Sequence, residues 1–236
     1  MLTSLILPCY NPQPGWDATI CREYTAFCKA IGATATELII VFDGSSSNVT
    51  EVQLQAIRST VPDVIFVFND VNRGKGYATR AGVSKASGDI IIYTDVDFPY
   101  TTKSMAQIYA KLAAHECDLA VGVKDAAYYS HVPPVRRIIS RGLRLFTGAL
   151  LSMPVTDTQC GLKGFRRSVA ATFLSTTIDR YLFDLEFVYK AFHRSGIKVL
   201  AVPVALKDNI VFRSMNYQIL LPEMLNFLKI FFNRGR

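Results

Sequence analysis

The sequence predicts an α/β fold in which a mostly parallel sheet is flanked by helices. Strand-like and helix-like segments alternate through the first half of the 236-residue chain, as they do in sheets assembled from β-α units. The segment at residues 90–94 is almost continuously apolar, which is typical of a parallel strand buried on both faces. The chain is also long enough for one large domain with a substantial core. We therefore expect a doubly wound sheet whose functional residues lie beyond the carboxyl ends of its strands.

The elements expected in the first half follow a regular order. Runs rich in β-branched, leucine and aromatic residues predict strands at residues 5–7, 37–42, 64–68 and 90–94. Apolar residues at helical spacing, or capping residues before such a segment, predict helices at residues 17–31, 51–58, 77–86 and 102–115. Each strand is thus followed by a helix, which places the carboxyl ends of the strands on one edge of the sheet.

The second half has a looser pattern and a distinct end. We expect strands at 118–123 and 198–204, helices at 135–151 and 181–194, and loops at 126–134 and 156–165, the latter running into a short strand. Residues 217–232 are strongly apolar at helical spacing, and Pro222 is expected to kink or restart this helix. We therefore expect a domain at 1–212 followed by an amphipathic C-terminal helical segment at 213–236. Its apolar and basic residues favour a membrane surface, and completion of the core or of a homodimer interface is the alternative.

The composition restricts the classes of partner. The net charge is +7 and the pI is near 9.2, so an anionic partner is expected. The basic residues are dispersed and form no nucleic-acid motif, which argues against nucleic acid and leaves phosphate ligands and an anionic membrane. No apolar run reaches about 18 residues, and the five cysteines are scattered without a C-x-x-C pair. These features favour a cytoplasmic protein with reduced thiols and without a membrane span or signal peptide.

The most informative motif is Asp95-Val96-Asp97, which directly follows the apolar run at 90–94. Ligands gather beyond the carboxyl ends of parallel strands, so both carboxylates are expected at the binding edge of the sheet. Mg²⁺ is usually held by one or two carboxylates together with substrate phosphates. The motif therefore predicts a divalent-metal site, and an Asp-rich turn that caps the next helix is the alternative.

Two further groups of residues favour a phosphorylated ligand. Asp43 follows the second strand and can accept hydrogen bonds from a base or a ribose, although a simple Asx-turn at Asp43-Gly44 is equally compatible. Arg73-Gly74-Lys75-Gly76 puts a cation and flexible backbone at a helix start, where phosphate binds readily. This stretch has neither the P-loop nor the dinucleotide spacing, and a surface turn is the alternative.

The later half contributes further candidate residues. Asp157 lies in a polar, glycine-bearing loop and is a candidate general base, while Gly161 permits a close backbone approach. Cys160 has no evident histidine partner, which argues against a cysteine nucleophile. Asp184 and Glu186 lie on an otherwise apolar helix. They could position a sugar or a catalytic loop, or they could form a solvated stripe.

In their order along the chain these segments resemble a known family. The segments are Leu7-Pro8-Cys9-Tyr10-Asn11, Asp43-Gly44-Ser45, Asn72-Arg73-Gly74-Lys75-Gly76, Asp95-Val96-Asp97, Asp157-Thr158-Gln159-Cys160-Gly161-Leu162-Lys163 and Phe183-Asp184-Leu185-Glu186. The chain resembles the inverting family 2 glycosyltransferases of the GT-A fold. Within them it is most similar to the polyprenyl-phosphate branch, which includes the dolichyl-phosphate glucose and mannose synthases. The resemblance covers residues 5–204, and the element at 157–163 is its most specific part.

The resemblance implies a GT-A fold, which is Rossmann-like, and a role for each motif. It implies a nucleotide-diphospho-sugar donor, with Asp97 and Asp157 as the catalytic residues. The residues implied for nucleotide-sugar binding are Pro8, Tyr10, Asp43, Lys75, Asp95, Val96 and Asp97. The implied cofactor is Mg²⁺ or Mn²⁺, held by Asp95 and Asp97. The residues implied for the acceptor phosphate are Lys124, Arg136 and Ser140. The residues implied as support for the sugar and the active site are Gln159, Gly161, Asp184 and Glu186.

Three positions depart from the family pattern. Pro12 stands where an acid usually follows Tyr-Asn, and Pro99 stands where a polar group often contacts the metal. Arg213 only approximates a late glycine-serine-basic element. These departures bear on donor and acceptor identity more than on the fold.

The expected function is that of a metal-dependent hexosyltransferase. It would move a hexose from a UDP- or GDP-sugar to a polyprenyl phosphate with inversion, as a peripheral protein on the cytoplasmic, inner face of the membrane. Transfer to a saccharide hydroxyl in polysaccharide assembly is one alternative. Nucleotidyl transfer and a non-catalytic nucleotide- or lipid-binding relative are the others.

Overall fold

The computed structural model describes residues 1–32, 35–45, 47–124, 158, 160–207, 226–227 and 230. The loop expected at 126–134, the helix expected at 135–151 and most of the C-terminal helix expected at 217–232 lie outside these residues. Within the described part of the chain, no helix is both long enough and apolar enough to cross a membrane.

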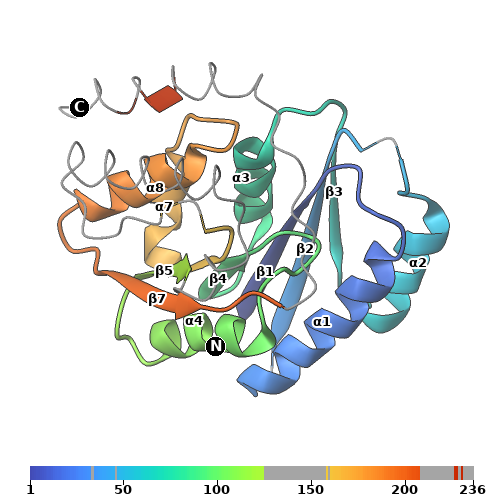
Figure 1. The fold of residues 1–236 in the computed structure, drawn as a ribbon, viewed down its shortest axis with the longest axis horizontal. Coiled ribbons are helices and arrows are strands. Elements are labelled where there is room, and N and C mark those ends of the chain that lie inside the picture. The colour runs from blue at the N-terminus through green and yellow to red at the C-terminus, as the bar shows by residue number, and fades with distance from the viewer. Residues whose placement is uncertain are drawn as a thin grey trace, which may run out of the picture.

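A seven-stranded sheet forms the centre of the molecule (Figure 1), with strand order β3-β2-β1-β4-β6-β5-β7. The strands are β1 (Thr3–Cys9), β2 (Thr36–Asp43), β3 (Ile65–Asn69), β4 (Ile90–Tyr93), β5 (Leu119–Lys124), β6 (Lys163–Arg166) and β7 (Val199–Val204). Neighbouring strands are parallel except that β6 runs antiparallel to both β4 and β5. The expected mostly parallel sheet is confirmed.

Helices cover both faces of the sheet (Figure 1). One face carries α1 (Trp16–Ile31), α2 (Glu51–Thr60) and α4 (Thr102–Ala113). The other carries α3 (Lys75–Lys85), α7 (Ala170–Leu174) and α8 (Phe183–Phe192), and a 3₁₀ turn, η1 (Arg167–Val169), leads into α7. The sequence did not predict η1 and α7, because a five-residue helix is too short to show an apolar period.

Successive residues of each central strand point into two different apolar cores. In β1, Leu5 and Leu7 lie in the core with α1, α2 and α4, whereas Ile6 lies in the core with α3, α7 and α8. All three side chains are fully buried. Burial on both faces explains the continuous apolar runs of the sequence. It also fixes the strand register, because a shift by one residue would exchange the two faces.

Several helix boundaries differ by one or two residues from the expected ones, and the structure shows the reason for two of them. α3 begins at Lys75, two residues earlier than expected, because a carbonyl far along the chain, that of Asp179, accepts from the amides of Gly76 and Tyr77. α4 ends at Ala113, shortly before His115 adopts a left-handed φ of 56°. Such tertiary contacts and local turns leave no clear apolar pattern.

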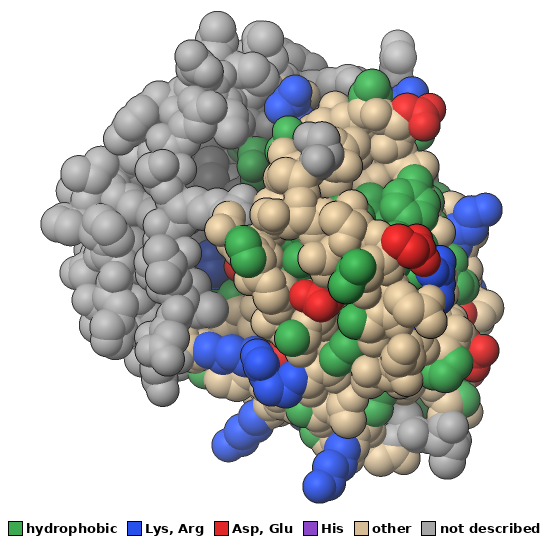
Figure 2. Space-filling model, turned by 90° about the vertical axis from the view of Figure 1, so that its right-hand side faces the viewer, with side chains coloured by type: hydrophobic (Ala, Val, Ile, Leu, Met, Phe, Trp, Pro, Cys, Tyr) green, Lys and Arg blue, Asp and Glu red, His purple; other side chains and the backbone are tan. Residues whose placement is uncertain are grey.

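The face that carries α1, α2 and β3 has a mixed surface. In Figure 2, acidic and hydrophobic side chains are scattered over the described residues of this face, and several basic side chains lie close together at the lower left. A nucleic-acid site usually shows a stripe or patch of basic residues. Hydrophobic and acidic side chains predominate over basic ones on the rest of the described surface in this view.

Candidate active site

The carboxyl ends of three adjacent strands bring candidate residues to one edge of the sheet. Asp43 ends β2, Tyr10 follows β1, and Asp95 lies two residues beyond β4. β1 lies between β2 and β4 and pairs with both in parallel, so the three ends meet. Tyr10 is 48 % exposed at this edge. The arrangement matches the binding edge of open α/β sheets.

A tight turn presents the carboxylates of Asp95 and Asp97. The Phe98 amide donates to the Asp95 carbonyl at 3.0 Å and closes the turn. Phe98 has a positive φ of 46°, and its side chain is fully buried in the core. Such backbone strain costs about 1–3 kcal/mol and persists where the surrounding packing enforces it. The buried ring therefore anchors the turn, while Asp97 stays exposed.

The two prolines that depart from the family pattern tie loops together. The Pro99 carbonyl accepts a hydrogen bond from the Lys207 amide at 2.9 Å, which connects the turn to the segment after β7. The Pro12 carbonyl accepts from Nδ2 of Asn48 at 2.9 Å, which connects the loop after β1 to the loop after β2. Both positions thus support the edge through their backbone.

Lys75, the first residue of α3, forms an ion pair with the first acid of the turn. Its Nζ lies 2.5 Å from Oδ1 of Asp95, and the two side chains are 21 % and 38 % exposed. Burial lowers the pKa of Lys75, but the negative charges of Asp95, Asp184 and Asp97 outweigh burial and raise this pKa above its ordinary value. Lys75 is therefore a persistent positive charge beside the carboxylates of the turn.

Gly161 lies against the other oxygen of the Asp95 carboxylate. A Cβ atom at position 161 would lie 2.5 Å from Oδ2 of Asp95. Only glycine fits there without a shift of the carboxylate. The Gly161 amide donates to the Tyr100 hydroxyl at 2.8 Å. The backbone at Gly161 therefore forms part of the wall around Asp95.

Cys160 has the environment of a structural thiol. Its side chain is fully buried, and its Sγ donates to the Tyr100 hydroxyl at 3.3 Å. Burial raises the pKa of this thiol, although the positive charges of Lys163 and Lys124 lower it in part. The thiol stays protonated, in agreement with the argument against a cysteine nucleophile. β5 passes close to this thiol, because a Cβ on Gly122 would lie 2.8 Å from Sγ of Cys160.

A buried lysine pairs with a buried acid behind Cys160. The Nζ of Lys163 lies 2.7 Å from Oδ1 of Asp184, and the two side chains are 0 % and 6 % exposed. The same oxygen accepts from the Tyr93 hydroxyl at 2.6 Å. Burial, followed by the charge of Asp184, raises the pKa of Tyr93, so its hydroxyl remains a donor. Lys163 also donates to the Cys160 carbonyl at 2.5 Å.

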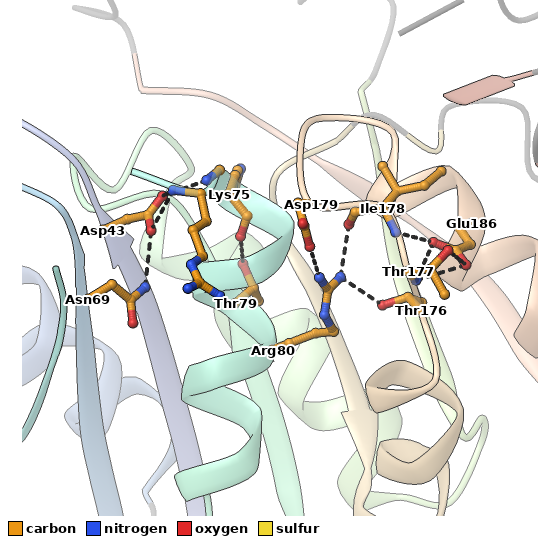
Figure 3. Close-up of polar contacts among 12 residues, drawn as sticks. Asp43, Asn69, Lys75, Thr79, Arg80, Thr176, Thr177, Ile178, Asp179 and Glu186 are labelled. Carbon is orange, nitrogen blue, oxygen red and sulfur yellow. Dashed lines mark hydrogen bonds and ion pairs between the residues drawn. The ribbon is translucent and has the colours of Figure 1, made fainter. Parts of the chain in front are cut away.

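The Asp43 carboxylate holds the loop that leads to Lys75 (Figure 3). It accepts from the amides of Arg73 and Gly74, with shortest distances of 3.2 and 2.7 Å. It also accepts from Nδ2 of Asn69 at 3.0 Å and is almost fully buried. Asp43 therefore positions the stretch 73–75 and does more than close a local Asx-turn.

Glu186 holds a second loop on the opposite side of α3 (Figure 3). Its carboxylate accepts from the amides of Thr177 and Ile178, each at a shortest distance of 2.8 Å. Glu186 is buried and pairs with Lys190 at 3.0 Å. Glu186 is thus a structural anchor for the loop at 176–179 and not part of a solvated stripe.

The loop at 176–179 occupies the start of α3. The Asp179 carbonyl accepts from the amides of Gly76 and Tyr77 at 2.8 and 3.2 Å. Arg80 donates to the Ile178 carbonyl at 2.8 Å and pairs with the Asp179 carboxylate. A phosphate near this helix start would therefore meet the ammonium of Lys75, because these two amides are already engaged.

The donor set at the turn fits a divalent cation that is completed by a ligand. Among the described residues, no group of three or more His, Cys, Asp or Glu is arranged to hold a metal ion. Asp95 and Asp97 supply two carboxylates, and Mg²⁺ is usually held by one or two carboxylates together with substrate phosphates. Mn²⁺ accepts the same oxygen ligands. These two carboxylates would leave the remaining ligand positions of such a cation to water or to phosphate oxygens.

The structure brings most of the expected residues in the described part of the chain to one region. Pro8 and Val96 are half-buried at the end of β1 and within the turn. Four expected residues lie outside the described part of the chain: Arg136, Ser140, Asp157 and Gln159. Three residues of the site had no predicted role: Tyr93, Tyr100 and Lys163. The available signal for Lys163 was a lysine among apolar residues, together with a later apolar helix that carries the possible partners Asp184 and Glu186.

The mostly parallel seven-stranded sheet with helices on both faces has the GT-A fold. The chain belongs to glycosyl transferase family 2, whose family model matches residues 4–174. The family and fold expected from the sequence are confirmed.

Two similar proteins have a lipid phosphate in their names. The undecaprenyl-phosphate 4-deoxy-4-formamido-L-arabinose transferase of Salmonella paratyphi A is 29 % identical over 171 residues, which cover 72 % of this chain and 50 % of that protein. The dolichyl-phosphate beta-glucosyltransferase of Mus musculus is 31 % identical over 216 residues, which cover 86 % of this chain and 64 % of that protein. The chain spans about half the length of the first of these relatives and less than two thirds of the second.

Solved structures share the fold at low sequence identity. Glucosyl-3-phosphoglycerate synthase from Mycobacterium tuberculosis, in complex with Mn²⁺, UDP-glucose and phosphoglyceric acid, is 16 % identical with a TM-score of 0.70; the match covers 99 % of this chain and 79 % of that one. A mannosyltransferase from Pyrobaculum calidifontis, in complex with GDP-Man and Mn²⁺, is 18 % identical with a TM-score of 0.56, covering 85 % and 54 %.

Proposed function

We propose that this chain is a metal-dependent hexosyltransferase that moves a sugar from a UDP- or GDP-sugar to a polyprenyl phosphate with inversion. The observation that carries the proposal is the meeting of Asp95, Asp97 and Lys75 at the carboxyl edge of the sheet in a family 2 chain. Two carboxylates and a lysine suit a diphosphate that is bound with a divalent cation. The names of the undecaprenyl-phosphate and dolichyl-phosphate relatives support a lipid phosphate as the acceptor.

The donor would lie across the ends of β1, β2 and β4. Tyr10 is exposed and offers a ring for the base, with Pro8 beside it. Asp43 would act by holding the loop that delivers Lys75, whose ammonium would bind a donor phosphate. A bound Mg²⁺ or Mn²⁺, held by Asp95 and Asp97, would stabilise the departing nucleoside diphosphate as a Lewis acid.

The acceptor phosphate would attack the sugar from the side opposite the leaving diphosphate, which inverts the anomeric centre. A lipid phosphate is already an anionic nucleophile, so it needs less help from a general base than a hydroxyl does. Lys124, Arg136 and Ser140 would bind and neutralise this phosphate. Asp157 would organise the site for a phosphate acceptor and would act as the base for a hydroxyl acceptor.

A lipid acceptor requires the site to face a membrane. In this proposal residues 1–212 form the transferase domain, and the apolar and basic segment 213–236 binds the cytoplasmic leaflet peripherally. Attraction to anionic lipid contributes about 1 kcal/mol for each nearby Lys or Arg. Flotation with anionic liposomes, with and without residues 213–236, tests this part, and equal binding of both proteins would contradict it.

The central test measures binding and turnover together. Thermal unfolding is followed with UDP, GDP and their sugars, each with and without Mn²⁺ or Mg²⁺; a ligand at about 100 times its Kd adds about 2.7 kcal/mol of stability. Asp97→Asn should abolish transfer and the metal-dependent shift while leaving the ligand-free protein folded. Asp63→Asn, an exposed acid between α2 and β3, is the control. Near-normal turnover by folded Asp97→Asn would contradict the metal assignment.

The products separate the alternative functions. Labelled sugar in the organic phase supports a polyprenyl-phosphate acceptor, and labelled sugar in the aqueous phase supports a saccharide acceptor. Release of pyrophosphate would indicate nucleotidyl transfer. Nucleotide binding without consumption of any sugar donor would indicate a non-catalytic relative.

A further inference from the structure

The peptide unit between Cys160 and Gly161 is held at both of its polar ends. Its carbonyl oxygen accepts a hydrogen bond from Nζ of Lys163 at 2.5 Å. Its amide donates to the Tyr100 hydroxyl at 2.8 Å. A peptide held in this way cannot rotate without breaking one of the two bonds. Because β6 begins only at Lys163, two side chains and not a strand ladder set the orientation of this unit.

The same peptide unit lies against the first acid of the candidate metal site. A Cβ on Gly161 would lie 2.5 Å from Oδ2 of Asp95, and Oδ1 of Asp95 pairs with Lys75 at 2.5 Å. The carboxylate is therefore enclosed between an ammonium and the backbone of Gly161. Rotation of the peptide would change the surface against which the carboxylate rests.

Stability alone does not explain a charged lysine at this buried position. Lys163 is fully buried and pairs with Asp184, which is 6 % exposed. Replacing a buried ion pair with apolar residues of similar volume is often neutral or stabilising. The bond to the Cys160 carbonyl, in contrast, requires a donor at the end of a long side chain. Asp184, itself fixed by the Tyr93 hydroxyl at 2.6 Å, keeps the Lys163 ammonium in place for that bond.

We propose that Lys163 is a positioning residue for metal and donor binding, and that Tyr100 has the corresponding role at the other end of the same peptide. Lys163, oriented by Asp184, keeps the peptide before Gly161 in the orientation that supports Asp95. It acts through Asp95 and touches none of the reacting atoms. This inference rests on the proposed function, because it depends on Asp95 holding metal and donor.

The test removes, one at a time, the two hydrogen bonds that hold the peptide between Cys160 and Gly161. Lys163→Met combined with Asp184→Asn eliminates the ammonium without leaving an unpaired buried carboxylate, and the new amide oxygen can still accept from Tyr93. Tyr100→Phe removes the other end without any change in charge. Because both ends hold one peptide, their effects should be less than additive when combined.

A second lysine of similar chemistry provides a matched control. Lys190 pairs with a buried acid of α8, Glu186, at 3.0 Å and donates to the Ser175 carbonyl at 2.6 Å. It therefore also joins an α8 carboxylate to a backbone carbonyl, but it does not hold the peptide between Cys160 and Gly161. Lys190→Met should keep wild-type metal binding and turnover.

The readouts are Mn²⁺ binding in the presence of UDP or GDP, followed by electron paramagnetic resonance, and kcat and KM for the sugar donor. For the Lys163→Met, Asp184→Asn protein and for Tyr100→Phe, we expect Mn²⁺ affinity or kcat to fall about 10–100-fold, as for other residues that orient metal ligands. The far-UV circular dichroism spectrum should match the wild type. A residue with a purely structural role would lower the unfolding temperature and leave Mn²⁺ affinity unchanged.

Each outcome decides a separate question. Folded variants with wild-type Mn²⁺ affinity and kcat would overturn this inference alone. A wild-type protein that binds no Mn²⁺ with either nucleotide would overturn the proposed function, and this inference with it. If the Lys163→Met, Asp184→Asn protein does not fold, Tyr100→Phe alone decides, because it leaves the buried ion pair intact.

Discussion

The site contains two lysine–aspartate ion pairs that differ mainly in their surroundings. The shortest N–O distances are nearly equal, 2.5 Å for Lys75 with Asp95 and 2.7 Å for Lys163 with Asp184. The first two side chains are 21 % and 38 % exposed, whereas the second two are 0 % and 6 % exposed. Distance alone therefore does not tell what an ion pair contributes, because solvent determines both its strength and the cost of separating its partners.

This difference assigns different tasks to the two pairs. Water screens partly exposed charges, so separating Lys75 from Asp95 costs little free energy. Lys75 could then bind a phosphate, and Asp95 could bind a metal ion. A buried charge that loses its partner stays uncompensated, so Lys163 and Asp184 cannot exchange. We therefore expect ligand exchange at Asp95 and a rigid support at Asp184.

The largest expected effect is on stability, and it separates the two pairs directly. Lys163→Met alone should lower the free energy of unfolding by about 3–5 kcal/mol, because it strands a buried carboxylate. Lys75→Met should change the same free energy by less than about 1 kcal/mol. Urea unfolding of both variants and the wild type measures the difference. Equal losses in both variants would show that exposure does not distinguish the pairs.

The next effect concerns Gly161, which lies next to both pairs. The methyl group of Gly161→Ala would meet Oδ2 of Asp95 at 2.5 Å and displace this carboxylate. A misplacement of about 1 Å in an active site can cost about 100-fold in rate, so kcat/KM should fall by about that factor. Steady-state kinetics with the sugar donor measures it.

Gly196→Ala is the matched control for this substitution. Gly196 has a positive φ of 84° and open space around its Cβ position. Alanine there should lower the free energy of unfolding by about 1–2 kcal/mol through backbone strain, with unchanged kcat/KM. A Gly161→Ala protein that instead lost stability and kept its activity would contradict the assigned contact with Asp95.

A smaller effect is expected when the exposed pair is broken. Lys75→Met removes the positive charge that competes with a metal ion for the Asp95 carboxylate. Two opposite unit charges about 4 Å apart attract each other by about 1 kcal/mol in water. Without nucleotide, Mn²⁺ should therefore bind about five-fold more tightly to the variant than to the wild type. Transfer should nevertheless slow, because the donor phosphate loses a cation. Electron paramagnetic resonance titration and steady-state rates test the two halves. Weaker Mn²⁺ binding would show that Lys75 does not compete for Asp95.

Parts of the fold that depend on local sequence patterns could be predicted, whereas parts that depend on distant contacts could not. The apolar runs that become β1, β2 and β4 are local signals, because both faces of each strand are buried. The antiparallel insertion of β6 between β4 and β5 has no such signal, since four residues carry little pattern and the pairing partners are far away in the sequence.

In the site, positions were predictable but partnerships were not. The acids Asp43, Asp95 and Asp97 could be placed because they follow predicted strands. Asp43 finds its donors 26 to 31 residues further along the chain, and Asp184 lies 91 residues from the tyrosine that donates to it. Such contacts arise only from packing, so the sequence patterns that located the acids at the strand ends did not reveal the residues that hold them in place.

A third acid, Glu37, extends the comparison to a carboxylate whose partners are neutral. It accepts from the Ser4 hydroxyl at 2.5 Å, from the Ser87 amide and hydroxyl at 2.6 and 2.8 Å, and from the Gly88 amide at 3.1 Å. Burial raises the pKa of Glu37, but these donors outweigh burial, and the net pKa is lower than its ordinary value. Glu37 therefore gives stability a pH dependence without an ion pair.

The smallest effect should appear in the acid dependence of stability. Because the folded protein lowers the pKa of Glu37, its contribution is fully present above the ordinary pKa of 4.5 and is lost as the pH falls from there through the lowered value. Urea midpoints measured from about pH 7 to about pH 3 should therefore decline more in the wild type than in Glu37→Gln. Ser87→Ala, which removes one donor, should lie between them. Identical acid profiles in all three proteins would show that neutral donors do not hold this carboxylate in its charged form.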